Sequence, residues 1–169
     1  MTPSLLASQV LNDHWDGFLP IDPMWLAERA GIYVVAEPEL ELDGISGDCY
    51  YDDDGLPIIR YNPCENERRR RFTIAYELGH LMLGHVQPGG RMHRDLKRDY
   101  KRYNETPKER QANDFAAQLL MPESILRLAA KAIPRLDKLA AEFNVSTESM
   151  GYRLQNIGIL ASERRAATW

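Results

Sequence analysis

The stretch that decides the fold is Arg71-Phe72-Thr73-Ile74-Ala75-Tyr76-Glu77-Leu78-Gly79-His80-Leu81-Met82-Leu83-Gly84-His85. Its apolar residues occupy nearly every side of a helix in the second half, and a helix of that kind is expected to be buried in the centre of a domain. Asn62-Pro63 is a helix start signal upstream. The sequence therefore predicts one long buried helix from there to about His85.

Polar and small residues interrupt this apolar helix. Glu77 carries a charge that is costly to bury without compensation, and His80 lies on the same face. Gly79 costs about 1 kcal/mol relative to alanine in a helix interior, so it marks the close approach of another backbone or a ligand. We expect the segment around these residues to carry function.

The spacing of Glu77 and His80 matches the second half of the His-Glu-x-x-His motif of zinc peptidases. In that motif two ligands four residues apart lie on one helix face and reach one metal ion, and the glutamate beside the first ligand polarises the metal-bound water. His80 takes the place of the second ligand and Glu77 that of the glutamate. The first ligand position holds Tyr76.

A third metal ligand commonly comes from a glutamate on another helix, and Glu109 is the candidate. Its segment, Thr106-Pro107-Lys108-Glu109, also fits a capping box, in which the glutamate only binds the backbone at the helix start. Spacing alone favours the cap over the ligand.

The rest of the chain predicts an α+β fold with a small, mostly antiparallel sheet packed on the central helix. Helix starts are expected at Thr2-Pro3, Asp22-Pro23 and Thr106-Pro107. Strands are expected over residues 32–35, 45–51 and 56–61, the last two flanking an Asp-Gly turn. Residues 86–105 are polar and are predicted to form a mobile loop or lid. We predict a zincin-like domain over residues 1–133 and a helical C-terminal extension over residues 134–169.

The C-terminal extension resembles a helix-turn-helix pair joined at Asn144-Val145-Ser146. Its basic residues barely outnumber its acidic ones, which argues against a phosphate-binding surface and favours a pair that completes the core. The basic run Arg68–Arg71 is expected to be the solvated face of a helix, with docking of an acidic partner as the alternative.

Composition sets the broad class. The chain has 169 residues, 44% hydrophobic and 27% charged, with a net charge of −4, which is typical of a globular protein. Two cysteines in a chain of this length favour a reducing environment. The N-terminus lacks the pattern of a signal peptide, and no apolar run approaches the ~20 residues that span a bilayer. We expect a cytoplasmic protein.

The central segment, together with Glu109 to Pro122, resembles the ImmA/IrrE family of metallo-endopeptidases. That family reads Phe-Thr-x-Ala-His-Glu-x-Gly-His and then Glu-x-x-Ala-x-x-Phe-Ala-x-x-Leu-Leu-Met-Pro. The resemblance implies a zincin-like fold, Zn²⁺ bound by His80 and Glu109, and Glu77 as the catalytic base. It also implies a helix-turn-helix repressor or antitoxin as the partner, in stress response, in prophage control or in a toxin–antitoxin system.

Tyr76 departs from the family pattern. A phenol has a pKa near 10 and must be deprotonated by a metal to bind it well, and it is longer than a histidine. Three interpretations stay open: a zinc endopeptidase that uses Tyr76, His80 and Glu109; a pseudo-peptidase that serves as a toxin or regulatory partner; and an introduced change at this position. His85 lies about 140° round an ideal helix from His80, so only a broken helix end could bring it in.

Overall fold

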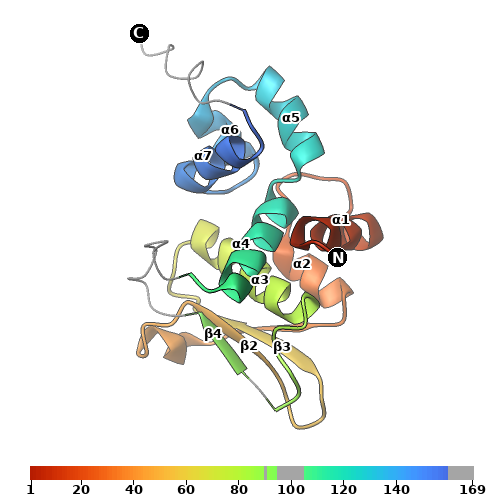
Figure 1. Cartoon of the computed structure of the whole chain (residues 1–169). Coiled ribbons are helices and arrows are strands. Elements are labelled where there is room, and N and C mark those ends of the chain that lie inside the picture. Colours follow the sequence, from red (N-terminus) through yellow and green to blue (C-terminus); the bar gives the residue numbers. More distant parts are fainter. Residues whose placement is uncertain (90, 95–104, 160–169) are drawn as a thin grey trace.

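The fold of the computed structural model, which describes residues 1–89, 91–94 and 105–159, is α+β, as predicted. Residues 91–94 are described by their backbone alone. In Figure 1 the sheet lies at the bottom, α3 and α4 lie across the middle, and α5, α6 and α7 lie at the top. The site helix is therefore enclosed between the sheet and the other helices.

The helices begin where the sequence places capping residues. Thr2 caps α1 and Asp22 caps α2, each followed by proline, and Thr106 caps α4. The helices and their bounds are α1 (Pro3–His14), α2 (Pro23–Arg29), the short 3₁₀ helix η1 (Pro38–Glu41), α3 (Glu67–Met82), α4 (Pro107–Leu120), α5 (Glu123–Ala132), α6 (Leu136–Glu142) and α7 (Thr147–Asn156).

The sheet has the strand order β1-β3-β2-β4. Its strands are β1 (Tyr33–Ala36), β2 (Gly47–Tyr51), β3 (Pro57–Tyr61) and β4 (Arg91–Arg94). The predicted hairpin is present as β2 and β3, and its turn is held by Asp52, whose carboxylate accepts the backbone N–H of Leu56 at 2.7 Å. The β1–β3 pairing is parallel, whereas β2 pairs antiparallel with both of its neighbours.

The prediction of a loop throughout residues 86–105 was wrong for part of that segment. Residues 91–94 form β4, which adds to the exposed side of β2. Backbone hydrogen bonds can hold a strand at a sheet edge whatever its side chains are. The polar sequence of β4 therefore lacks the alternation of apolar and polar residues by which a strand is predicted. Residues 95–104 of the predicted lid lie outside the described residues.

The central helix is shorter than predicted at both ends. It begins at Glu67, because Asn66 caps it and accepts the backbone N–H of Arg69 at 3.0 Å. The upstream Asn62 instead accepts the backbone N–H of Cys64 at 2.9 Å, which makes a turn of the Asn-Pro segment. The helix ends at Met82, and Gly84 follows with a φ of 69°.

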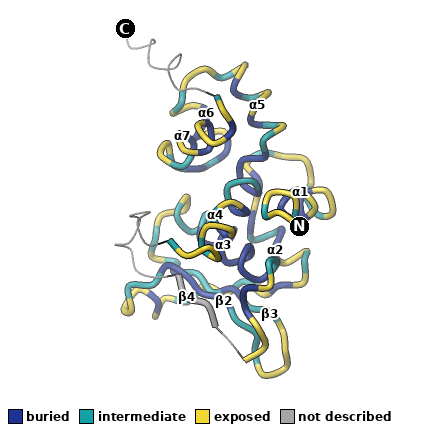
Figure 2. Tube along the Cα trace, viewed as in Figure 1, coloured by how far each residue is buried: buried dark blue, intermediate teal, exposed yellow. Residues whose placement is uncertain are grey.

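The C-terminal helices complete the core, as one of the two interpretations predicted. Leu139, Phe143 and Met150 are fully buried. Arg153, the basic residue of α7, turns inward and donates to the carbonyl of Met121 at 3.1 Å. Figure 2 shows the buried positions of α6 and α7 on their inner sides. The division at residue 133 stays a prediction, and residues 160–169 of the extension lie outside the described part of the chain.

The expectation that Arg68–Arg71 form a solvated face holds for Arg68, which is exposed, but not for Arg69, Arg70 and Arg71, which are half-buried. Each guanidinium contacts another segment: Arg68 the side chain of Asn144, Arg69 that of Ser46, and Arg70 the carbonyl of Pro63. Arg71 donates to the carbonyl of Ile21 at 2.6 Å, and burial lowers its pKa. This run holds the first turns of α3 against the surrounding loops.

Candidate functional site

The candidate site lies on the second half of α3, at the centre of the fold. Tyr76 is 6% exposed, Glu77 is fully buried and His80 is 1% exposed. The helix can lie this deep because Gly79 faces α4: a Cβ at that position would come within 3.0 Å of the Phe115 ring. The close approach predicted from Gly79 is therefore an aromatic side chain rather than a backbone or a ligand.

Glu77 points toward the sheet. Its carboxylate lies close enough to the Cys49 thiol of β2 to affect that group electrostatically, and a Cβ at Gly47 would lie 3.7 Å from Glu77 Cγ. Burial raises the pKa of Cys49, and the neighbouring Glu77 carboxylate raises it further. The sequence gave no signal for this neighbour, because Cys49 reaches the helix only through the packing of β2 on α3.

His80 lies between two rings. The Tyr76 ring packs edge-on against it with centroids 4.7 Å apart, and the His85 ring does so at 5.0 Å. The Nδ1 atoms of His80 and His85 are 2.9 Å apart, and His85 Nε2 lies 2.9 Å from Gln111 Oε1. Burial lowers the pKa of His85, which favours the neutral form of its ring.

The contact between His80 and His85 arises from the broken end of α3. After Met82 the chain turns at Gly84, whose positive φ of 69° suits a glycine, and the backbone N–H of His85 bonds to the His80 carbonyl at 2.9 Å. A continuous helix would have kept His85 away from His80, and the broken helix end, the one condition under which the sequence allowed His85 to approach, is present. The signal was present in the sequence, since a glycine directly after an apolar helix is a common stop.

Glu109 occupies the capping box that the sequence favoured. Its carboxylate accepts the Thr106 backbone N–H, and its own N–H donates to the Thr106 hydroxyl at 3.3 Å. The same first turn of α4 reaches α3 through two other residues: Gln111 binds His85, and Lys108 donates to the His85 carbonyl at 3.2 Å. The first turn of α4 thus lies beside the end of α3, and one carboxylate oxygen of Glu109 is engaged in the cap.

The segment that carries this site also matches a known protein family in sequence. The family model described as the IrrE N-terminal-like domain of peptidase family M78 covers residues 27–155. The chain belongs to the IrrE-like family. Among solved structures, a Mycobacterium tuberculosis transcriptional regulator is similar, with a TM-score of 0.64 and 21% identity over 90% of this chain and 46% of that one. The chain thus spans about half of that regulator. No curated protein matches it.

The IrrE-like family is typically zinc-dependent, so the donor set can be tested against a zinc ion. Within residues 1–89 and 105–159, the His, Cys, Asp and Glu side chains form no group of three or more that could hold a metal. Tyr76 replaces a neutral imidazole, and Glu109 is engaged as a cap. Among the side chains that the structure describes, this arrangement does not fit the three-ligand zinc centre of a metallopeptidase.

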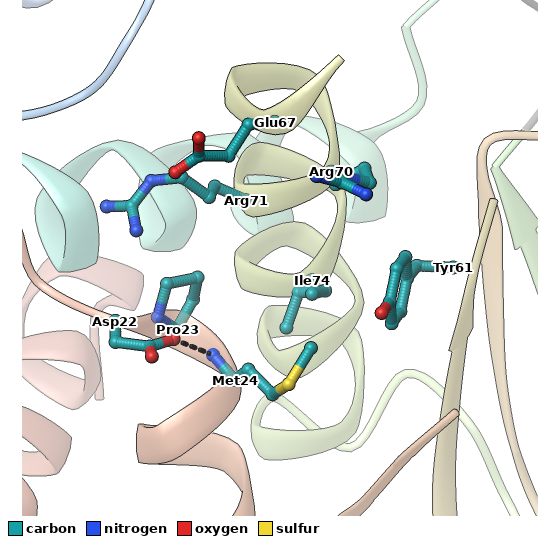
Figure 3. Close-up of a pocket in the computed structure, with 8 residues that line it drawn as sticks. All are labelled: Asp22, Pro23, Met24, Tyr61, Glu67, Arg70, Arg71 and Ile74. Atoms are coloured by element: carbon teal, nitrogen blue, oxygen red, sulfur yellow. Dashed lines mark hydrogen bonds between the residues drawn. The ribbon is translucent and has the colours of Figure 1, made fainter. Parts of the chain in front are cut away.

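The IrrE-like domain also has a pocket of about 230 Å³ beside the first half of α3. Figure 3 shows Met24 and Ile74 reaching into the space between the start of α2 and Tyr61 of β3. Acidic Asp22 and Glu67 and basic Arg70 and Arg71 line it together. Arg70 and Arg71 already donate to backbone carbonyls. The lining therefore favours neither an anionic nor a cationic ligand.

Among the described residues, none of the helices combines the length and the apolar character needed to cross a bilayer.

Proposed function

We propose that this IrrE-like protein is a regulatory partner of a helix-turn-helix repressor or antitoxin, and that it acts by binding rather than by hydrolysis. Tyr76 carries this proposal. It stands where the motif needs a neutral imidazole, and a phenol offers a metal only a weak, protonated donor at neutral pH. The capping role of Glu109 supports it, because a second ligand position is then also engaged.

The proposed partner comes from the family resemblance. The similar solved structure is that of a transcriptional regulator, which supports a role in gene control for this fold. As a binding protein the chain would inhibit or sequester its partner, as a toxin or regulator does, in stress response or in prophage control.

A zinc endopeptidase is the second candidate. Glu77 and His80 keep their motif positions, and both are buried. Burying a carboxylate costs free energy, and a protein that only binds has no need of one there, so the retained Glu77 favours this candidate. In that case Tyr76, His80 and Glu109 would be the zinc ligands and Glu77 the general base. The zinc would supply an activated water and polarise the peptide carbonyl.

Metal content and cleavage distinguish the two candidates. The full chain and its Tyr76→His variant are loaded with zinc, freed of excess, and analysed for bound metal. Each is then incubated with a candidate helix-turn-helix repressor chosen from the genomic neighbourhood. We expect the native chain to bind the repressor without cutting it and to retain little zinc. We expect Tyr76→His to hold about one zinc per chain, because it restores an imidazole ligand.

A tyrosine outside the site provides the control. Tyr152→His changes a 42% exposed residue of α7 and should alter neither zinc content nor cleavage. Stoichiometric zinc in the native chain that is lost in His80→Ala, with cleavage that is lost in Glu77→Gln, would establish the endopeptidase instead.

A further inference from the structure

The hydrogen bonds around His80 have a direction. His85 Nε2 and Gln111 Oε1 are 2.9 Å apart, and the amide oxygen can only accept, so His85 Nε2 carries the hydrogen. A neutral imidazole has one N–H, so His85 Nδ1 then holds a lone pair. The Nδ1 atom of His80 faces that lone pair at 2.9 Å and must be the donor.

We infer that Gln111 and His85 are positioning residues that fix His80 as its Nδ1–H tautomer, with the lone pair on Nε2. Two neutral nitrogens cannot approach to 2.9 Å as two lone pairs, so one proton lies between them. The orientation of Gln111 decides which ring supplies it.

The contacts that hold this series of hydrogen bonds do not involve the His80 ring. The backbone N–H of His85 bonds to the His80 carbonyl at 2.9 Å, and Lys108 holds the His85 carbonyl at 3.2 Å. Both ends of the His85 backbone are therefore anchored, one by α3 and the other by α4. A ring held in this way has a defined orientation, which is the condition for setting the tautomer of a neighbour.

This inference goes beyond the proposed function, because it concerns a proton of the unliganded protein and holds whether or not a repressor is bound or cut. It also explains how His80 can keep the form of a metal ligand although Tyr76 occupies the other ligand position of the motif. His80 Nε2 is kept in the form that a cation or a hydrogen-bond donor needs, although its motif neighbour is now Tyr76.

The test is a long-range ¹H–¹⁵N correlation spectrum of the metal-free full chain, labelled at its histidines. It is recorded at about pH 8, above the ordinary imidazole pKa. The chain has four histidines, and the His80 signals are assigned by their loss in His80→Ala. We expect His80 to show a protonated Nδ1 and an unprotonated Nε2, and His85 to show the reverse. A protonated Nε2 on His80 in the native chain would overturn the inference.

Variants of Gln111 test the cause. Gln111→Leu removes the acceptor at an exposed position and should shift His80 to a mixture of tautomers, whereas Gln111→Glu keeps an acceptor and should preserve the native pattern. Gln155→Leu, an exposed glutamine of α7, is the matched control. An unchanged His80 pattern in Gln111→Leu would show that Gln111 does not set the tautomer.

Discussion

The side-chain amide of Asn144 donates a 2.6 Å hydrogen bond to the carboxylate of Glu67, and this bond joins the α6–α7 turn to the first turn of α3. Two arginines strengthen the contact: Arg68 reaches the Asn144 side chain at 3.4 Å, and Arg71 reaches its carbonyl at 3.3 Å. The C-terminal helix pair is therefore tied directly to the helix that carries the candidate site.

Asn144→Ala should destabilise the protein by about 1–2 kcal/mol, because Asn144 has a φ of 49° that alanine adopts at a cost and because its hydrogen bonds are lost. Chemical denaturation measures the change. Asn144→Gly should lose less, since glycine accepts this φ. Asn156→Ala, at the exposed end of α7, is the control. Equal stability of Asn144→Ala and the native chain would remove the anchoring role.

Gly79→Ala and Gly151→Ala should change stability in opposite directions. Both glycines lie inside helices, where alanine gains about 0.5–1 kcal/mol. At Gly79 the added Cβ would lie 3.0–3.2 Å from Phe115, so overpacking should outweigh that gain and leave a net loss of about 1 kcal/mol. At Gly151 nothing lies within 4 Å, so the variant should be more stable. Thermal unfolding of the pair is the measurement, and a stabilised Gly79→Ala would contradict the close packing of α3 on α4.

Glu109→Gln should separate capping from metal binding. The glutamine oxygen can still accept the Thr106 N–H, so stability should change by less than about 0.5 kcal/mol, whereas Glu109→Ala should lose about 1 kcal/mol. Placed in the Tyr76→His background, Glu109→Gln should lower the zinc content, because a carbonyl oxygen is a poorer zinc ligand than a carboxylate. Full zinc occupancy in that double variant would exclude Glu109 as a ligand.

Asp114→Asn should stabilise the protein at neutral pH. Burial raises the pKa of the Asp114 carboxyl above its ordinary value, and the nearby Glu105 raises it further, so the charged form is disfavoured in the folded state. The folded state therefore binds the proton more tightly than the unfolded state. The native chain gains stability as the pH falls through the raised pKa, and below the unfolded pKa the advantage of asparagine should vanish.

Thermal unfolding of both proteins from pH 7 to pH 3 checks this. Asp43→Asn, at an exposed loop position, controls for the loss of one negative charge. An advantage of Asp114→Asn that stays constant with pH would have to come from something other than ionisation.

Local signals in the sequence predicted the parts of the fold that local chemistry determines. The caps at Thr2, Asp22 and Thr106 set helix starts through hydrogen bonds within three residues, and the Asp-Gly turn set the hairpin. The start of α3 was misplaced because Asn62-Pro63 forms a turn that uses the same residue types as a helix start. Strand β4 and the roles of Arg68–Arg71 depend on partners far along the chain.

The candidate site divides in the same way. The placement of Glu77 and His80 on one buried helix follows from their spacing, and the capping box of Glu109 follows from a four-residue pattern. The neighbours of these residues come from tertiary packing: Cys49 from β2 and Gln111 from α4. His85 is the intermediate case, because the glycine before it signals the end of the helix without indicating where the ring then lies.

The two cysteines differ in exposure, which allows one of them to be labelled selectively. Cys49 is sealed in the core with a raised pKa, which keeps it a thiol, whereas Cys64 is exposed in the turn before α3. A maleimide fluorophore added to the native chain should therefore attach at Cys64 alone. That position adjoins the first turn of α3, so a single dye there could report on partner docking while the interior of the domain stays unmodified.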